Sequence, residues 1–416
     1  MRYFSLLSIF LLALLLQSCS RENTAAIIWT DRAEFAMYAE YFNSLQGKYK
    51  IETRYYPYPA RVLTGTPVQK MPDIVVGSWL KSAATRSHFA PLDGLFKGKK
   101  LKRDTFYPSL LALGSIDKKQ YLLPVSFNLP SLIFSRSNGS RVTNPFVITL
   151  DEIKELGGEY NKQNNSTYTH MGFSPAWNED FLYVVTSLFN TNFREANPLA
   201  WDPLALEKSI TYIQNWIKEK NTSVQAEEDF VFKYLFSSPS KLAASGRILF
   251  GYMQSYDLFT LPEEQQTNLD FRWVAHEKNI IVLEGSTYIG ICKEGKARKA
   301  ANAFLLWFFN EETQLLLLEN SRKFRINEGS FGIANGFSAL RTVTEQIYPR
   351  FYPLLLGHMP PQDYLCPPNI LPSNWMVLKE RVILPYFHER LRTTSRMDLV
   401  SLERRISEWY RQNPNR

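Results

Sequence analysis

Apolar and polar residues alternate along residues 25–80 in blocks that predict strands and one helix. Residues 26–29 and 73–77 are apolar runs typical of buried strands, and residues 51–55 alternate as a strand would. Between residues 29 and 51, one helical face is marked by Phe35, Tyr38, Phe42 and Leu45. Asp31 stands three residues before Glu34, as in a capping box, so we expect it to cap this helix. This order of elements favours an α/β domain with a largely parallel sheet.

The rest of the chain is predicted to be more helical. We expect helices over residues 206–220, 229–236 and 297–310 and from residue 376 to the end, with strands at 248–251 and 279–283. Helical spacing assigns the buried faces to Leu206, Ile210, Ile213 and Ile217, to Ala301, Phe304, Leu305 and Phe308, and to Leu399, Leu402, Ile406 and Tyr410.

The first residues predict export. An apolar run over residues 6–16 follows Arg2, and it is too short to be a typical membrane span. Its ending, Leu16-Gln17-Ser18-Cys19, resembles the lipobox of bacterial lipoproteins, which implies that residues 1–18 are a signal peptide and that Cys19 is acylated. Residues 19–24 would then be a lipidated tether. An ordinary secretion signal or a single-pass anchor is the alternative.

Composition and net charge exclude some classes of function. The chain has 416 residues, 45% hydrophobic and 14% aromatic, which allows two or three globular domains. Its net charge of +8 is scattered, without basic and aromatic residues interleaved, so we expect no nucleic-acid partner. Three cysteines are too few for a disulfide scaffold; Cys292 and Cys366 are either bridged or two buried thiols.

Enzyme motifs are missing from the sequence. It lacks a nucleophile elbow, a phosphate-binding loop, a dinucleotide fingerprint and a zinc-protease motif, and the five histidines are far apart. Glu179 and Asp180 are adjacent rather than opposed, which makes them a poor glycosidase pair. We therefore expect no enzyme activity, metal or cofactor.

Several segments match one known family in their order and spacing. They are Ile28-Trp29 through Asn43, Met71 to Gly77, Pro91 to Phe96, Tyr121 to Asn128, Ser245 to Arg247 with Gly251 to Met253, and Lys299 to Phe308. In these segments the chain resembles the extracellular solute-binding proteins of bacterial ABC importers, particularly the sugar-binding group. Two places depart from the family pattern. Ile248, Leu249 and Phe250 stand where small residues are usual, and Gly285-Ser286 replaces a glycine pair.

The resemblance implies a type II periplasmic-binding-protein-like α/β fold, with two lobes, each a mainly parallel sheet flanked by helices, and a ligand cleft between them. Lobe 1 would comprise residues 25–130 and 284–335, and lobe 2 residues 131–283 and 336–416. The implied function is capture of a small solute, most of all a carbohydrate, for ABC permease subunits, by a monomer anchored outside the cell membrane through lipid. The open alternatives are a surface lipoprotein for adhesion or sensing on the same fold and a glycan-hydrolysing lipoprotein.

Candidate ligand-binding residues are aromatic and polar residues at predicted strand ends and crossovers. Aromatic faces stack on the apolar faces of sugars, and polar groups meet the hydroxyls. The candidates are Trp29, Arg32, Ser78, Trp79, Asn128, Trp177, Asn178, Tyr252, Tyr288 and Trp375. For Arg32 the alternative is a surface charge, and for Tyr252 and Tyr288 it is a place in the core with a satisfied hydroxyl.

Overall fold

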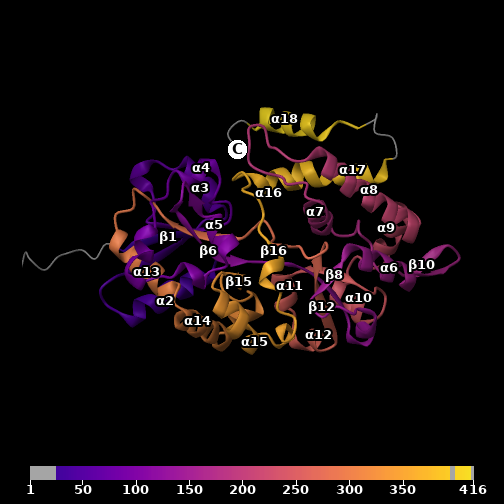
Figure 1. Cartoon of the computed structure of the whole chain (residues 1–416), viewed down its shortest axis with the longest axis horizontal. Helices are drawn as coiled ribbons and strands as arrows, with labels where there is room; N and C mark the ends of the chain where they lie inside the picture. Colours follow the sequence, from indigo (N-terminus) through magenta and orange to yellow (C-terminus); the bar gives the residue numbers. More distant parts are fainter. Residues whose placement is uncertain (1–24, 394–398, 414–416) are drawn as a thin grey trace, which may run out of the picture.

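The computed structural model describes residues 25–393 and 399–413 and shows two lobes side by side along the long axis (Figure 1). The first lobe is built on a six-stranded sheet and the second on a four-stranded sheet. A C-terminal group of helices lies along the edge of the molecule where the two lobes meet (Figure 1). The predicted leader, Cys19 and the tether lie outside the described residues.

The six-stranded sheet has the order β15-β6-β14-β3-β1-β2. Its strands are β1 (Ala26–Thr30), β2 (Ile51–Tyr55), β3 (Ile74–Gly77), β6 (Leu122–Phe127), β14 (Thr287–Ile291) and β15 (Phe337–Ser338). Strand β1 pairs in parallel with β2 and β3, but β14 runs antiparallel to β3 and β6. The sheet is therefore mixed, and the expectation of a mainly parallel sheet was wrong. Strand β14, which the chain forms on its return from the second lobe, runs in the direction opposite to its neighbours β3 and β6.

Helices α2 (Glu34–Leu45) and α13 (Arg298–Phe308) cover this sheet, as the apolar spacing predicts. The ring of Phe35 lies 5.4 Å from that of Phe308, which binds the N-terminal helix to one about 260 residues later in the chain. Leu45 is the last residue of α2 and is 54% exposed, so the prediction that it lies on the buried face of the helix was wrong. Helix α14 (Glu311–Lys323) follows α13.

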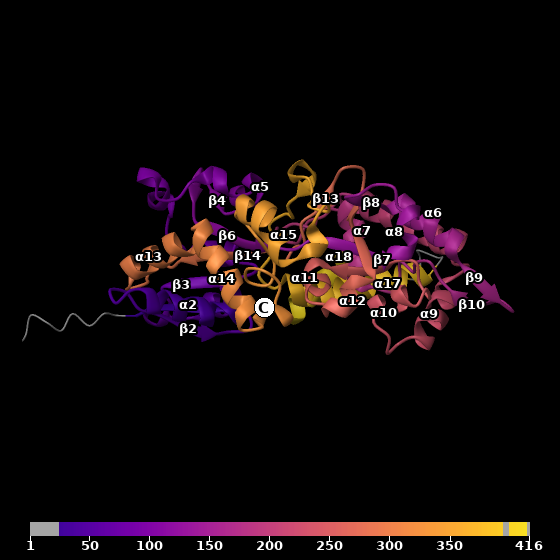
Figure 2. The ribbon, with the colours of Figure 1, turned by 90° about the horizontal axis from the view of Figure 1, so that it is seen from below.

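The four-stranded sheet of the second lobe has the order β11-β7-β12-β8. Its strands are β7 (Pro130–Ser135), β8 (Val147–Thr149), β11 (Gly251–Gln254) and β12 (Leu269–Ala275). Only β8 and β12 pair in parallel. The helices of this lobe include α6 (Leu150–Tyr160), α7 (Glu179–Leu188), α8 (Pro203–Lys220), α9 (Val224–Lys233), α10 (Pro239–Ala244) and α11 (Ser255–Phe259). Figure 2 shows α9 and α10 together at one edge of the second lobe.

The two lobes are joined by crossing segments and by aromatic packing. The chain passes from β6 to β7 through Asn128, and it returns from the second lobe through β13 (Ile280–Ile281) to β14. At the junction, Phe259 of α11 stacks on Phe331 with ring centroids 4.8 Å apart. Strand β15 lies just beyond the predicted lobe boundary at residue 335 and pairs with β6.

The C-terminal helices pack on the second lobe. They are α16 (Trp375–Leu378), the π-helical turn η9 (Lys379–Ile383), α17 (Leu384–Arg392) and α18 (Leu402–Gln412). Leu402 and Ile406 are buried, as their helical spacing predicts. The predicted helical C-terminal segment is confirmed from Trp375 to Arg392 and over α18, but Leu399, which was expected on the same helical face, lies before α18 and outside the helix.

Several local predictions need correction. Asp31 does not cap α2, because the residue before the helix is Ala33 and no side chain there bonds the free N–H groups. The strand predicted at 248–251 is reduced to an isolated bridge at Ile248 before β11 begins at Gly251, and the one at 279–283 contracts to Ile280–Ile281. Helix α9 starts before the predicted 229–236 segment and ends at Lys233. Cys292 and Cys366 are free thiols, so the bridged alternative was wrong.

In the part of the chain that the structure describes, no helix is both long enough and apolar enough to cross a membrane.

Candidate ligand-binding site

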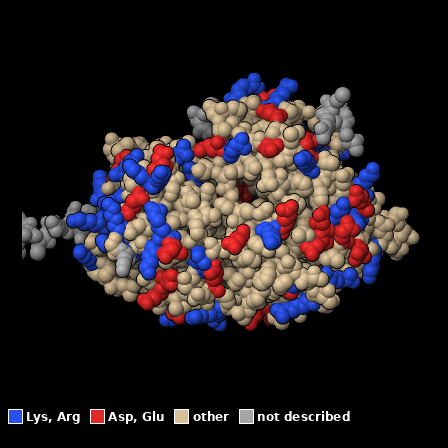
Figure 3. Space-filling view, viewed as in Figure 1, with Lys and Arg blue, Asp and Glu red and all other residues tan. Residues whose placement is uncertain are grey.

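A cavity of about 1000 Å³ lies between the two lobes and the C-terminal helices. Figure 3 shows a hollow near the middle of one face, with acidic side chains at its bottom and charges of both signs scattered around it. Four tryptophans line the cavity, of which Trp79 and Trp177 are half-buried while Trp375 and Trp409 are buried in the core behind it. Aromatic faces and polar groups therefore share one enclosed space.

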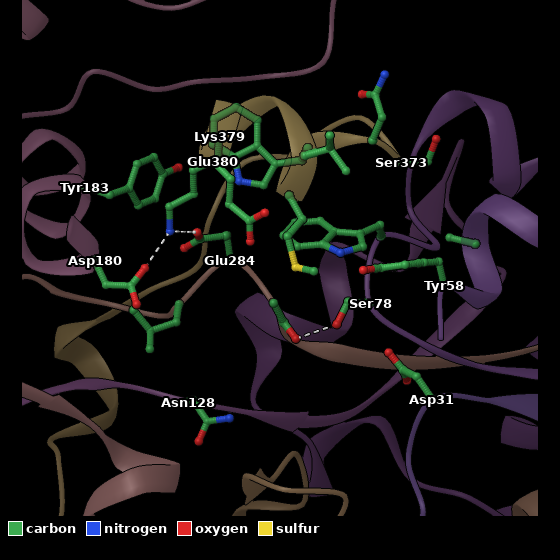
Figure 4. A pocket seen from close by; sticks show the side chains of 18 of the residues that line it. Asp31, Tyr58, Ser78, Asn128, Asp180, Tyr183, Glu284, Ser373, Lys379 and Glu380 are labelled. Atoms are coloured by element: carbon green, nitrogen blue, oxygen red, sulfur yellow. Dashed lines mark hydrogen bonds and ion pairs between the residues drawn. The ribbon is translucent and has the colours of Figure 1, made fainter. Parts of the chain in front are cut away.

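The first-lobe wall comes from the ends of β1 and β3, which pair in parallel and so end at the same sheet edge. Arg32 follows β1, and its guanidinium donates to Ser78 Oγ at 3.2 Å. Ser78 in turn donates to the Gly285 carbonyl at 2.7 Å, which joins this wall to the crossing segment (Figure 4). Trp79 adopts a positive φ of 66°, a conformation that is rare for a bulky residue, at the point where the chain leaves β3.

The second-lobe wall is formed where the chain enters α7. Asn178 caps this helix, and its side chain accepts from the Phe181 N–H at 3.1 Å. Trp177, just before the cap, is half-buried and packs edge-on against Phe230 of α9, with ring centroids 6.2 Å apart. The cap fixes the backbone at the start of α7, and so it fixes the position from which the Trp177 side chain projects.

A crossing segment between the lobes contributes Asn128. Its amide donates to the Asn335 carbonyl at 2.8 Å and accepts from Ser255 Oγ at 2.6 Å. Both partners hold the amide plane in place, so this side chain is oriented before any ligand arrives.

A charge cluster joins the C-terminal wall to the rest of the cavity. Lys379 Nζ lies 2.7 Å from Glu284 Oε1 and 2.9 Å from Asp180 Oδ1, and 4.4 Å from the centre of the Tyr183 ring (Figure 4). Gln254 donates to the second Asp180 oxygen at 2.8 Å. Lys379 is 9% exposed, and these contacts come from α7, a crossing segment, β11 and the π-helical turn.

Burial and charge act in opposite directions on the ionisable groups of the cavity. Burial by itself lowers the pKa of Lys379, but Glu284 and Asp180 outweigh it and the net pKa is raised. Burial raises the pKa of Asp31, which Arg32 opposes from 3.4 Å. Lys379 is therefore a permanent cation at neutral pH.

Seven of the ten residues expected from the sequence to bind ligand line this cavity. They are Arg32, Ser78, Trp79, Asn128, Trp177, Asn178 and Trp375. Contact with a ligand stays a prediction for each of them.

The other three candidates, Trp29, Tyr252 and Tyr288, are not in the lining. Trp29 lies inside β1, 4% exposed, with its ring 4.5 Å from that of Tyr56. Tyr252 is buried against Phe181. Tyr288 is 1% exposed and donates to the Leu110 carbonyl at 2.8 Å, so it is a core residue with a satisfied hydroxyl.

Reasoning from sequence missed most of the charge cluster. Lys379, Glu284, Gln254 and Tyr183 were not among the candidates, and Asp180 was weighed only as half of a catalytic pair. One weak signal was available, because Glu284 directly precedes Gly285-Ser286 at a predicted crossover. Nothing in the sequence connects that carboxylate with a lysine about 95 residues later.

Among the described residues, no group of three or more histidines, cysteines or acids has the geometry of a metal site.

The chain matches a known family over residues 37–325, the family described as bacterial extracellular solute-binding proteins. Among curated proteins, no sequence matches the chain.

Solved structures share the fold at low sequence identity. The sugar-binding protein MalE from Xanthomonas citri is 12% identical with a TM-score of 0.66, over 94% of this chain and 96% of its own. A sugar transporter protein from Rhizobium etli in an open conformation is 15% identical with a TM-score of 0.64, over 92% and 98%. A cyclo/maltodextrin-binding protein complexed with maltotetraose is 12% identical with a TM-score of 0.64, over 93% and 97%. The expected two-lobed fold is confirmed.

Proposed function

Because the chain belongs to the bacterial extracellular solute-binding proteins, we propose that it captures a carbohydrate between its lobes and delivers it to an ABC permease. Membership of an extracellular family makes it an exported protein, and the family is one of binding proteins. The ligand, the permease partner, the monomeric state, the lobe boundaries and the lipid anchor at Cys19 are parts of the proposal.

The observation that carries the proposal is the wall of the cavity. The half-buried indoles of Trp79 and Trp177 offer faces for the C–H surfaces of sugar rings. Asn128, Ser78 and Arg32 offer polar groups that their neighbours already orient. The volume of about 1000 Å³ favours an oligosaccharide over a single sugar ring.

Similar structures support the same class of ligand. The maltodextrin-binding neighbour holds maltotetraose, and another similar structure, 14% identical with a TM-score of 0.59, holds mannotriose. These likenesses concern the fold, and the aromatic wall of this chain gives the independent reason to test oligosaccharides first.

A thermal-shift screen tests the proposal directly. Maltotetraose, mannotriose, simple sugars, amino acids and polyamines should be compared at millimolar concentration, since a ligand present at about 100 times its Kd stabilises the folded state by about 2.7 kcal/mol. We expect an oligosaccharide to raise Tm. A shift with amino acids or polyamines alone would replace the carbohydrate proposal, and cleavage of the glycan would replace binding with hydrolysis.

Substitution of the indoles locates the site. Trp79→Ala and Trp177→Ala should each weaken oligosaccharide binding about tenfold or more, measured by calorimetry, because central aromatic contacts dominate binding energy. Trp201→Ala is the matched control, since Trp201 is half-buried and outside the cavity lining. Unchanged affinity in both cavity variants would place the ligand elsewhere.

The anchor has its own test. Cys19→Ser should abolish metabolic labelling with a fatty acid and release the protein from membranes, because acyl chains provide stable anchoring. Labelling that persists in this variant would refute lipidation at Cys19.

A further inference from the structure

A buried carboxylate lies behind the second-lobe wall and has no role in the site described so far. Glu227 in the first turn of α9 is 1% exposed. Its Oε2 accepts from Ser174 Oγ at 2.5 Å and from the Ala176 N–H at 3.3 Å, and its Oε1 accepts from the Asn221 amide at 2.6 Å. Two of these partners belong to the loop that precedes Trp177.

The donors around Glu227 are fixed in direction. The Gly172 N–H must donate to Asn161 Oδ1, at 2.7 Å, which makes the Asn161 amide nitrogen a donor to Asn221 Oδ1 at 2.9 Å. The Asn221 amide nitrogen is thereby turned toward Glu227 and also donates to the Phe173 carbonyl at 2.9 Å. Glu227 thus faces two obligatory donors, the Asn221 amide and the Ala176 N–H.

Helix α9 holds the same loop with a second side chain. Phe230, nearly one turn after Glu227, packs against the ring of Trp177. The hydrogen bond to Glu227 therefore fixes the backbone at Ala176, and Phe230 packs against the side chain of the next residue, Trp177.

We propose that Glu227 is a positioning residue, whose carboxylate holds residues 174–176 so that Trp177 stands in the ligand cavity. The proposal deepens the proposed function, because the role of Trp177 in binding rests on it. Protonation of this carboxyl would place a hydrogen on one acceptor oxygen and weaken its charge-assisted bonds to the loop.

Burial brings this event close to neutral pH. It raises the pKa of Glu227 to about 7, against the bonds from Asn221, Ser174 and Ala176 that lower it. The charged group that adds to the rise is Glu228, which forms an ion pair with Arg392; the hydrogen-bonding partners of Glu227 are all neutral. The loop should therefore be held more tightly at pH 8 than at pH 6.

Fluorine NMR of the protein labelled with 5-fluorotryptophan tests the proposal without a ligand. The Trp177 resonance is assigned by its loss in Trp177→Phe and should titrate with a midpoint near pH 7. Glu227→Gln, which retains shape but not charge, should abolish the titration. Ser174→Ala should move the midpoint to higher pH, because it removes a bond that favours the charged form.

Glu228→Gln is the matched control, since it removes a neighbouring carboxylate that does not contact the loop, and the titration should survive in it. A Trp177 resonance that is constant from pH 5.5 to 8.5, or that titrates equally in Glu227→Gln, would overturn the proposal. Ser174→Ala retains the test if Glu227→Gln fails to fold.

A second measurement connects the loop to binding. The affinity for maltotetraose by calorimetry should be about fivefold weaker at pH 6 than at pH 8, and independent of pH in Glu227→Gln. Equal pH dependence in both proteins would overturn the link between Glu227 and the cavity. Absence of binding in both would count against the proposed carbohydrate ligand, and the NMR titration would still decide the role of Glu227.

Discussion

Two buried lysines, one in the wall of the cavity and one in the core of the first lobe, show how differently one residue type is used. Lys379 on the C-terminal wall is held between Glu284 and Asp180. Lys81 lies two residues beyond Trp79 in the first lobe, is 7% exposed, and has no hydrogen-bond acceptor among the described residues. Its ammonium lies 4.1 Å from the centre of the Tyr288 ring.

The groups around the two lysines shift their pKa values in opposite directions. Burial lowers the pKa of Lys81 to about 7 with no acid to oppose it, whereas the two carboxylates raise the pKa of Lys379 despite its burial. The Lys379 region is stabilised by its charge, and the Lys81 region carries a desolvation cost behind the loop that presents Ser78 and Trp79. The comparison teaches that burial alone does not decide what a lysine contributes to stability.

The largest expected effect is on the Lys379 side. Lys379→Met would leave Asp180 and Glu284 without their common cation, and we expect it to lower the free energy of unfolding by about 4 kcal/mol. Urea denaturation measures the change. Glu380→Gln, an exposed neighbour, should change stability by less than about 0.5 kcal/mol. If Lys379→Met is neutral, the cluster contributes no net stability.

The second effect should have the opposite sign. Lys81→Met removes the buried ammonium, keeps an apolar stem against Tyr288, and should raise the free energy of unfolding at pH 6 by about 3 kcal/mol. The same denaturation series detects it. A loss of stability of similar size would mean that the ring contact outweighs desolvation, and the contrast between the two lysines would collapse.

The pH dependence sharpens the contrast. Because the pKa of Lys81 falls from 10.5 in the unfolded chain to about 7, the unfolded state binds more protons between these values, and stability should rise with pH across that window. The slope should be up to about 1.4 kcal/mol per pH unit relative to Lys81→Met, which lacks the group. Parallel stability curves for the two proteins from pH 7 to 9 would contradict this pKa.

The smallest effect should come from an exposed pair on α18. Arg404 and Glu408 lie 3.1 Å apart, with side chains 72% and 42% exposed. Glu408→Gln should cost about 0.3 kcal/mol or less by the same denaturation method. A cost as large as that of Lys379→Met would show that the number of ion pairs, rather than their burial, sets the energetics.

Much of the architecture followed from local patterns. The helical spacing of Phe35, Tyr38 and Phe42 and the apolar runs of β1 and β3 predicted the first elements, because one buried face imposes its period on the sequence. The same reasoning left Tyr288 open, since a tyrosine in a strand has the same local pattern whether its hydroxyl meets a ligand or a backbone carbonyl. Local patterns could not predict the direction of β14 either, because this strand joins the first sheet after the chain has passed through the whole second lobe.

By itself the sequence determined the periodic elements, the α/β class and the family, since these depend on neighbouring residues and on the order of short motifs. Only the tertiary structure decided that Asp180 and Glu284 both contact the ammonium group of Lys379, whereas no carboxylate offsets the burial of Lys81. The pKa of a buried group depends on what faces it, and those partners come from segments about 100 or more residues apart.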